Sequence, residues 1–290
     1  MSERNVKGKH FVFLGGSHGM GRAAAMALAK RGASILIVGR GSEAGEAAVA
    51  QALQLGATDA NFLPGDLSTI AGIRQVARGI QDWQGEISGM MHTAMAAFRN
   101  RIATEDNLDF AFALQYLARA ALNRLLADNL AASGDGRIVH IAGNVSAKMA
   151  GVDLNDLQFR HRKWSFFKSI LGTHHLGFLH LQEAARRWGD MPVYPMASCV
   201  ESVKTKAMQD PAMPLVMRLM GRFGTSPELA SRNAVTMLTI ADNSDLKGAI
   251  VRKSKHYQPE PLQLDSADAG RLWAITTEIA AEHGLDLPYP

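Results

Sequence analysis

The sequence predicts an α/β fold built on one doubly wound parallel sheet with helices on both faces. Two observations carry this prediction. Short apolar runs alternate with longer helical stretches along the 290 residues, which is typical of parallel strands joined by helical crossovers. In addition, a glycine cluster directly follows the first apolar run, and folds of this class bind ligands at such strand ends.

The glycine cluster is the most informative stretch of the chain. The apolar run 11–14 ends at Gly15, and residues 22–31 have the composition of a helix. Gly15, Gly19 and Gly21 have G-x-x-x-G-x-G spacing, so the turn lacks Cβ atoms and lets a pyrophosphate approach backbone N–H groups at the helix N-terminus. An ordinary strand-to-helix turn is the alternative. The position on the first strand of an alternating chain favours a nucleotide cofactor.

The other elements follow from apolar periodicity and from turn residues. Further strands are expected where short runs are apolar, at residues 33–40, 60–63, 87–93, 137–142, 192–197 and 248–251. Helices are expected where the periodicity is helical, at residues 42–53, 68–81, 107–131, 165–188, 227–241 and 268–283. With the strand at 11–14, this gives about seven strands in a single Rossmann-type sheet.

Composition places the chain among globular proteins. Hydrophobic residues make up 47% and charged residues 20%, which excludes a disordered chain and favours one domain over residues 1–290. The net charge of +4 is spread along the chain without a Lys/Arg run typical of nucleic-acid binding. No apolar run could span a bilayer, and the N-terminus lacks an apolar signal region. We therefore expect a cytoplasmic protein without a membrane or nucleic-acid partner.

Metal chemistry is not expected. Cys199 is the only cysteine, which excludes an intramolecular disulfide and a multi-thiolate metal site. His174, His175 and His180 have i, i+1, i+6 spacing and do not converge on one helix face as i, i+4 histidines do. The sequence therefore predicts no metal.

The motifs resemble those of the short-chain dehydrogenase/reductase family over nearly the whole chain. The glycine turn is similar to the family's T-G-x-x-x-G-x-G, with Leu14 in the threonine place. The resemblance implies a nicotinamide cofactor, a small-molecule substrate and an oxidoreductase activity on a carbonyl or alcohol. It also implies that the turn holds the cofactor, through Gly15, Ser17, His18, Gly19, Met20 and Gly21.

Arg40 indicates which cofactor is bound. Gly39 and Arg40 end the second predicted strand, and they are similar to the family members that prefer NADP. An arginine there can bind a 2′-phosphate, whereas the acid found in NAD binders would repel it. We therefore expect NADP(H) as the cofactor, with His18 and Arg22 as further residues that assist Arg40 in binding it. A solvated loop arginine is the alternative.

The adenine side of the cofactor site is also similar to the family. Asp66 matches the aspartate that contacts adenine, with Leu67 next to it. As a bare residue, Asp66 could equally be a turn or cap acid. The segment at residues 89–95 lies where the family has N-N-A-G, and only Ala94 matches. We expect Asp66, Leu67 and Ala94 to line the cofactor site.

The catalytic pattern departs from the family. Ordinary members use a tyrosine as acid/base and a lysine four residues later, because one helical turn places both on the same face. None of the four tyrosines in this chain has a lysine four residues later. Matching the end of the predicted helix 165–188 to retinol-dehydrogenase-like members puts Ile170 in the tyrosine place and His174 in the lysine place.

The candidate catalytic residues lie around these places. His174 could bond ribose hydroxyls or act as an acid/base, since a histidine titrates near neutral pH, whereas His175 would point elsewhere. Gly143 holds the family's serine place, with Asn144 and Ser146 as the nearest polar substitutes. A buried structural role for His174 is the alternative.

Further expectations concern residues that surround the pocket. His92 and His140 are expected to end strands at the C-terminal edge of the sheet. Gln115 falls where the family has an asparagine. The family's P-G turn after the sixth strand is absent, with Ser198 and Cys199 in its approximate place.

The resemblance also implies a substrate lid and an oligomer. The lid would span about residues 200–225, and its methionines favour a bulky apolar substrate, although plain helix packing explains them equally. A helical extension is expected over about residues 259–290. The helices at 107–131 and 165–188 are where the family builds a dimer interface, so we expect a homodimer or homotetramer.

Three functions fit this combination. The first is an NADP(H)-dependent oxidoreductase with a non-standard proton donor. The second is a redox-neutral isomerase, dehydratase or cyclase on the same scaffold, and the third is a non-catalytic NADP(H)-binding protein. The cofactor motifs favour the first, because hydride transfer depends mainly on proximity and orientation. The loss of tyrosine, lysine and serine together favours the other two.

Overall fold

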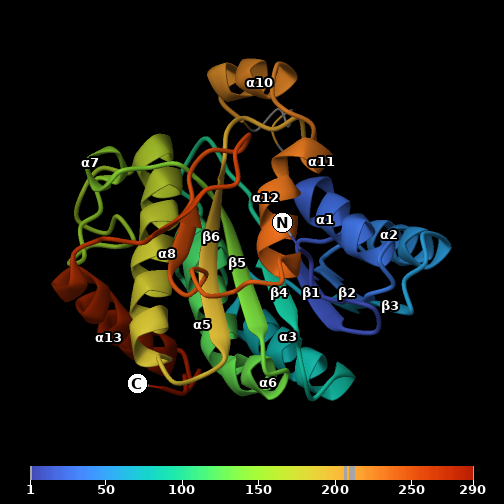
Figure 1. The fold of residues 1–290 in the computed structure, drawn as a ribbon. Coiled ribbons are helices and arrows are strands. Elements are labelled where there is room, and N and C mark those ends of the chain that lie inside the picture. Colours follow the sequence, from blue (N-terminus) through green and yellow to red (C-terminus); the bar gives the residue numbers. More distant parts are fainter. Residues whose placement is uncertain (1, 206–207, 209–212, 290) are drawn as a thin grey trace.

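The sheet confirms the predicted fold class. The computed structural model describes residues 2–205, 208 and 213–289. One sheet joins the strands in the order β3-β2-β1-β4-β5-β6-β7-β8, and all neighbours are parallel except β7 and β8 (Figure 1). The strands are His10–Leu14 (β1), Ser34–Gly39 (β2), Asp59–Pro64 (β3), Gly89–His92 (β4), Gly136–Gly143 (β5), Val193–Val200 (β6), Ala249–Val251 (β7) and Pro259–Pro261 (β8). The strand order reverses between β1 and β4, where doubly wound sheets bind ligands.

The eighth strand corrects the expected count of about seven. β8 occupies the start of the segment that we expected to be a helical extension, and Glu260 lies opposite Ile250 of β7. The Leu262 N–H donates to the Gly248 carbonyl at 2.8 Å. Antiparallel pairing alternates between bonded and non-bonded positions, so Pro259 and Pro261 fall where no N–H is required. A proline-rich strand is therefore tolerated at this edge.

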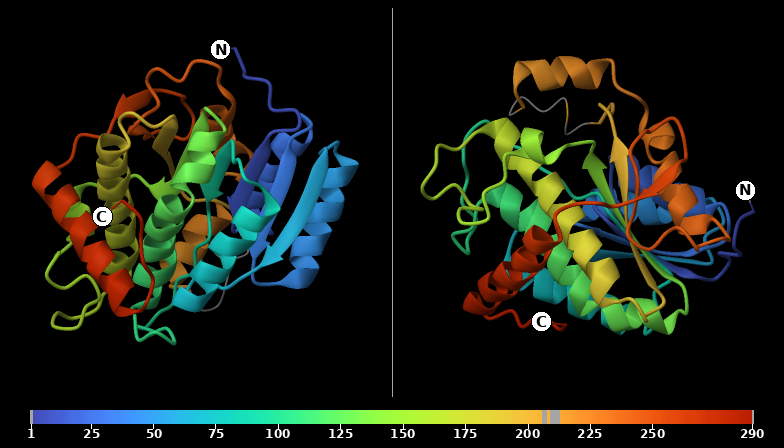
Figure 2. Two further views of the ribbon diagram at one scale, coloured as in Figure 1. Left: turned by 90° about the horizontal axis from the view of Figure 1, so that it is seen from below. Right: turned by 60° about the vertical axis from the view of Figure 1, so that its left-hand side comes forward.

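Helices cover both faces of the sheet. One layer contains α1, α2 and α12, and the other contains α3, α5 and α8, with α13 packed outside α8 (Figures 1 and 2). None of the described helices is both long and apolar enough to cross a membrane. Their bounds are Gly19–Ala29 (α1), Ser42–Gln54 (α2), Ile70–Trp83 (α3), Phe110–Phe112 (α4), Ala113–Leu117 (η1), Ala118–Leu125 (α5), Ala127–Ala132 (α6), Ala147–Ala150 (α7), Phe166–Arg187 (α8), Leu215–Arg222 (α10), Pro227–Ala230 (α11), Arg232–Thr239 (α12) and Ser266–Glu282 (α13).

The helix predicted over 107–131 is interrupted. Asn107 has a φ of +57°, which does not fit a right-handed helix, so the helix starts after Asp109, whose carboxylate accepts from the Phe112 N–H. The segment η1 is a π-helix, and Leu126 separates α5 from α6. Apolar periodicity does not reveal either interruption, because every fragment keeps its apolar face toward the sheet.

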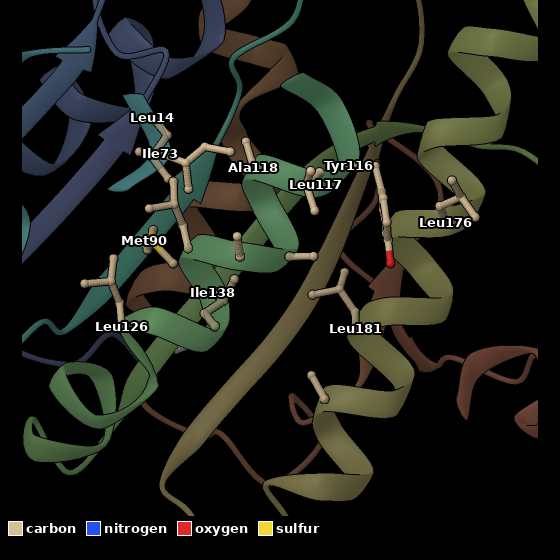
Figure 3. Packing of buried hydrophobic residues seen from close by; sticks show 14 of the residues in the cluster. Leu14, Ile73, Met90, Tyr116, Leu117, Ala118, Leu126, Ile138, Leu176 and Leu181 are labelled. Atoms are coloured by element: carbon tan, nitrogen blue, oxygen red, sulfur yellow. The ribbon is translucent and has the colours of Figure 1, made fainter. Parts of the chain in front are cut away.

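An apolar core lies between the sheet and the layer of α3, α5 and α8. Leu14 and Met90 from the sheet pack with Ile73 of α3, while Leu117 and Leu181 join η1 to α8 (Figure 3). All five side chains are buried. These packed apolar side chains thus fix the carboxyl ends of the strands against the helices.

The C-terminal helix α13 covers the outer face of α8. Trp273 stacks on His180 with ring centroids 5.1 Å apart and an interplanar angle of 7°. Arg124 of α5 donates to the carbonyl oxygens of Leu287 and Pro288. Figure 2 shows α13 lying along α8, so α8 is packed on two sides by its own chain.

This packing bears on the expected oligomer. We expected self-association through the helices at residues 107–131 and 165–188. In the structure, α13 and the C-terminal segment cover the face of α8 that points away from the sheet. The homodimer or homotetramer stays a prediction, and it requires a surface other than this one.

Candidate cofactor and active site

The glycine turn packs its backbone directly against the end of β4. A Cβ added at Gly15 would lie 2.6 Å from the backbone nitrogen of Ala94, and one added at Gly21 would lie 2.5 Å from the Oγ1 of Thr93. Gly15 also has a φ of +88°, which favours glycine. Side chains at these two positions would therefore break the contact between β1, α1 and β4.

The turn leaves hydrogen-bonding groups open at the N-terminus of α1. His18 is the N-cap residue with extended backbone, and its side chain does not cap the helix, which starts at Gly19. The buried Ser17 Oγ has no hydrogen-bond partner among the described residues and lies beside Gly39 of β2. Phosphate oxygens would satisfy such groups, so the turn fits a dinucleotide cofactor.

Arg40 stands exposed directly after β2. No hydrogen bond or ion pair engages its guanidinium within the described part of the chain. The neighbouring Arg22, which we expected as a helper, donates from Nε to the Gln51 Oε1 at 3.0 Å. Near the end of β2, Arg40 thus has its whole guanidinium available within the described residues, whereas Arg22 uses its Nε for Gln51.

Asp66 shapes its own turn. Its Oδ1 accepts from the Ser68 backbone N–H at 2.9 Å and from the Ser68 hydroxyl at 2.7 Å. Leu67 is buried, and Ala94 is half-buried at the end of β4. The structure thus gives Asp66 the turn role that we weighed as an alternative, while contact with adenine stays a prediction.

The segment after β6 departs from the sequence-based placement. Ser198 and Cys199, expected near the missing P-G turn, lie inside β6 and are fully buried. Burial raises the pKa of the Cys199 thiol to about 12. Beyond the strand, the Cγ2 of Thr205 lies 3.3 Å from the position that a Cβ of Gly19 would take. Thr205 therefore closes over the glycine turn, a role that a lone threonine in a loop does not signal.

The expected lid is only partly described. Residues 206–207 and 209–212 lie outside the described residues. Of the remainder, α10 forms a short helix above the C-terminal edge of the sheet (Figure 1). Gly221 of α10 packs against Met208, and Arg99 from the loop after β4 donates to the Met213 carbonyl at 3.4 Å. The role of this segment as a substrate lid stays a prediction.

His174 lies beside the family's serine place. The Gly143 N–H donates to His174 Nδ1 at 3.0 Å, so α8 and the end of β5 meet at these two residues. Because Nδ1 accepts, the neutral tautomer carries its proton on Nε2. The structure thus brings together Gly143 and His174, while the assignment of His174 to the family's lysine place stays a prediction.

Burial changes the chemistry expected of His174. Desolvation, with a smaller contribution from the cationic Arg119, lowers the pKa of His174 to about 3. The imidazole is therefore uncharged at neutral pH. The expectation that His174 titrates near neutral pH is therefore wrong, because burial disfavours the charged imidazole.

Arg119 is a buried residue at the site that sequence reasoning missed. Its Nη1 donates to the Ile141 carbonyl of β5 at 2.8 Å and its Nη2 to the Ala94 carbonyl at 3.3 Å. Burial lowers its pKa to about 10, and no carboxylate pairs with it among the described residues. The sequence does contain a sign of a buried cation here, because a single arginine stands among the small apolar residues Ala118, Ala120 and Ala121.

The polar substitutes after β5 have other partners. Asn144 is exposed and its Oδ1 accepts from Nη1 of Arg252 at 3.2 Å. Ser146 is the N-cap of α7, and its Oγ accepts from the Met149 N–H. Neither contacts His174 in the interactions that the structure gives, so we leave both out of the proposed chemistry.

Ile170 faces apolar surroundings in place of the family's tyrosine. It lines a small hollow with Ala96, Phe98 and Phe110, and the buried Asp109 borders the same hollow. Burial raises the pKa of the Asp109 carboxyl despite its bond to the Phe112 N–H and the nearby Arg101. Sequence reasoning missed Asp109, whose only signal was that of a helix cap.

Gln115, in the family's asparagine place, lies on the same side of the sheet. Its Nε2 donates to the Ala96 carbonyl at 2.8 Å. The Gln115 side chain is buried, and its Oε1 lacks a partner within the described chain. Gln115 thus fixes the loop after β4.

The histidines His92 and His140 belong to the core. Asn123 links them, because its Oδ1 lies 2.9 Å from His92 Nε2 and its Nδ2 lies 2.9 Å from His140 Nε2. His92 ends β4 as expected, whereas His140 lies in the middle of β5, so its expected place at the strand end is wrong. His175 points to α13, where Asp268 lies near it, which confirms that it points away from His174.

Comparison with known proteins agrees with this geometry. The family model described as short chain dehydrogenase matches residues 9–153. The chain is 25% identical to human Retinol dehydrogenase 13 over 301 residues, covering 99% of this chain and 88% of that protein. It is 29% identical to mouse Polyprenol dehydrogenase, covering 96% of this chain and 86% of that protein.

Solved structures support the fold. A short chain dehydrogenase from Burkholderia cenocepacia in complex with NADP superimposes with a TM-score of 0.65 at 19% identity, covering 83% of this chain and 94% of that one. The RhlG/NADP complex of Pseudomonas aeruginosa superimposes with a TM-score of 0.68 at 15% identity, covering 87% and 97%. With its glycine turn, its strand order and the matched family model, the chain belongs to the short chain dehydrogenase family of oxidoreductases.

Proposed function

We propose that the protein is an NADP(H)-dependent oxidoreductase acting on a carbonyl or alcohol group of a bulky apolar small molecule. The glycine turn carries this proposal. Gly15 and Gly21 leave no room for a Cβ, and the N-terminus of α1 and the Ser17 hydroxyl stay open for phosphate oxygens. An ordinary strand-to-helix turn that binds no cofactor would not need both the missing Cβ atoms and the open hydrogen-bonding groups.

The preference for NADP(H) over NAD(H) rests on Arg40. Its exposed guanidinium directly follows β2 and has no partner among the described residues. A 2′-phosphate would form charge-assisted bonds with it, whereas a ribose hydroxyl offers no negative charge. The two NADP complexes with the same fold are consistent with this preference.

The proposed role of His174 is that of a neutral hydrogen-bond donor. When bound, NADPH supplies the hydride for carbonyl reduction. Nδ1 of His174 accepts from Gly143, which leaves the Nε2–H to bond a ribose hydroxyl or the substrate oxygen. With a pKa of about 3, the imidazole holds no second proton at neutral pH, so water delivers the proton to the reduced oxygen. General acid help contributes only ~10²- to 10⁴-fold, and a slow reductase can work without it.

The hollow beside Ile170 gives partial support to the proposed substrate class. Its wall joins the apolar Ala96, Phe98, Phe110 and Ile170 to the polar Asn100, Asp109 and Ser169, so it suits a small apolar group of a substrate that also meets a few polar side chains. Two relatives bear the names Retinol dehydrogenase 13 and Polyprenol dehydrogenase. Both names refer to long apolar alcohols, which supports a substrate of this class.

The redox-neutral and non-catalytic alternatives stay open, because the tyrosine place holds Ile170. The deciding experiment uses NADPH deuterated at the transferable position, incubated with the protein and a panel of apolar aldehydes and ketones. Deuterium in the product demonstrates hydride transfer. Product without label indicates redox-neutral chemistry, and a thermal shift with NADPH but no product with any substrate favours a binding protein.

A variant at His174 tests the proposed donor. His174→Ala removes the Nε2–H, and we expect turnover to fall by ~10²-fold or more while NADPH still raises the melting temperature. His175→Ala is the matched control one residue away, because that side chain points to α13. Undiminished turnover of His174→Ala would remove His174 from the proposal.

A further inference from the structure

An apolar stripe lies on the solvent side of α10. Leu215, Leu219 and Phe223 are 65%, 52% and 84% exposed. Their i, i+4, i+8 spacing places them within about 80° of the helix circumference. Folded proteins rarely leave such a stripe in water unless something covers it.

The charges on α10 are all positive. Arg218 and Arg222 border the stripe, and the helix Leu215–Arg222 contains no acidic residue. A helix with one apolar face and a basic border is typical of segments that lie on an anionic lipid surface.

The same end of the molecule extends this surface beyond α10. Met149 of α7 and Phe167 of α8 are 56% and 48% exposed, and both elements begin at the C-terminal edge of the sheet, the edge that α10 overhangs (Figures 1 and 2). Within residues 144–170, every exposed charged side chain is cationic, whereas the acids are partly or fully buried. These cations are Lys148, Arg160, Lys163 and Lys168.

We propose that this end of the molecule, with the stripe Leu215, Leu219 and Phe223 at its centre, docks on the surface of an anionic phospholipid bilayer. The docking is peripheral and replaces the expectation of no membrane partner that the sequence alone suggested. It rests on the proposed function for the apolar substrate class, which would be dissolved in the bilayer. The site opens at the same edge, so substrate would enter from the lipid rather than from water.

Vesicle sedimentation tests this docking. The full chain is mixed with vesicles of phosphatidylcholine alone, or with phosphatidylglycerol added as the anionic lipid. We expect binding to the anionic vesicles and little to the neutral ones. Leu219→Asp combined with Phe223→Asp should weaken binding by about tenfold or more. Arg218→Gln combined with Arg222→Gln should weaken binding to anionic vesicles by about fivefold for each arginine.

Leu53→Asp is the matched control, because Leu53 on α2 is 49% exposed but far from α10 in the fold. This variant should bind vesicles like the wild type. The proposal is overturned if the wild type binds neither kind of vesicle, or if the double aspartate variant binds as well as the wild type. A dimer in light scattering that the aspartate variant dissociates, without vesicle binding, would assign the stripe to a second copy.

The thermal shift with NADPH separates this test from that of the proposed function. Every variant should keep the shift, since α10 does not form the glycine turn. If NADPH gives no shift with the wild type while vesicles bind, the cofactor proposal fails and the docking stands. If NADPH binds and vesicles do not, the docking fails alone.

Discussion

The cofactor half and the catalytic half of this molecule are built differently. At the glycine turn, the groups that would hold a ligand are backbone N–H groups, and the sequence only has to keep Cβ atoms away at Gly15 and Gly21. Beside α8, the family's chemistry depends on particular side chains, and Ile170, His174 and Gly143 stand in those places. A backbone site survives many substitutions, whereas a side-chain site is lost in a few. The turn therefore predicts binding better than it predicts the reaction.

The strongest test of this difference is a side chain in the turn. Gly15→Val places a Cβ against the Ala94 nitrogen and forces a β-branched residue to a φ of +88°. NADPH binding should fall by more than ~100-fold, and overpacking should cost about 1–3 kcal/mol of the free energy of unfolding. Fluorescence titration and urea unfolding measure the two effects.

The control for this change is Gly85→Ala, because a Cβ there meets no atom within 4 Å. It should leave both the NADPH affinity and the urea midpoint unchanged. Wild-type NADPH affinity in Gly15→Val would show that the ligand does not use the turn, and the contrast between the two halves would disappear.

The catalytic half should respond to acid. Burial lowers the pKa of His174 and His180 from 6.5 to about 3. Below pH 6.5 the unfolded chain binds protons that the folded chain cannot, so this contribution to stability is fully present above pH 6.5 and is lost as the pH falls toward 3. Each histidine should lower the free energy of unfolding by about 1.4 kcal/mol per pH unit in that range. Urea unfolding at several pH values measures this slope.

His180→Phe isolates one of these contributions. Phenylalanine keeps a ring against Trp273 but cannot bind a proton, so the acid slope should fall by about 1.4 kcal/mol per pH unit. The same slope in wild type and variant would mean that His180 is not held neutral by burial.

The choice of cofactor should depend on one side chain. Arg40→Ala removes the guanidinium after β2, and the Kd for NADPH should rise by ~10- to 100-fold, as expected for lost charge-assisted bonds. The Kd for NADH should stay the same. Arg78→Ala, an exposed arginine on α3, serves as the control. An equal loss of affinity for both cofactors would assign Arg40 a structural role instead.

The smallest effects are expected at the polar substitutes after β5. Asn144→Ala and Ser146→Ala should each change turnover by less than about threefold, because their side chains bond Arg252 and cap α7. Ser146→Ala should still cost about 0.5–2 kcal/mol of stability, the usual value of an N-cap. A loss of turnover comparable with that of His174→Ala would return these residues to the active site.

Features that arise from local sequence were predictable. The strands, the helix starts and the glycine turn follow from apolar runs, caps and the steric demand at Gly15. Local pattern was therefore enough to find the sheet edge and the cofactor turn. The contact between His174 and Gly143, 3.0 Å long, was not predicted, because it joins residues that are 31 positions apart in the chain.

Features that arise from contacts distant in sequence were not predictable. The pKa of His174 depends on burial under several elements, and the short strand β8 exists only because β7 offers an edge to it. Thr205 reaches Gly19 only once the sheet has formed. Arg119 and Asp109 were visible as polar residues in apolar surroundings, but their neighbours were not.

The position of α13 has a consequence for synthesis of the chain. A chain leaves the ribosome N-terminus first, at roughly 5–20 residues per second. The helix α8 ends at Arg187, but the residues that cover it, Trp273 among them, are made about 80 residues later. For several seconds the nascent protein therefore carries the apolar side of α8 uncovered. A chaperone that binds ribosome-attached chains would find its binding surface on α8 during that interval.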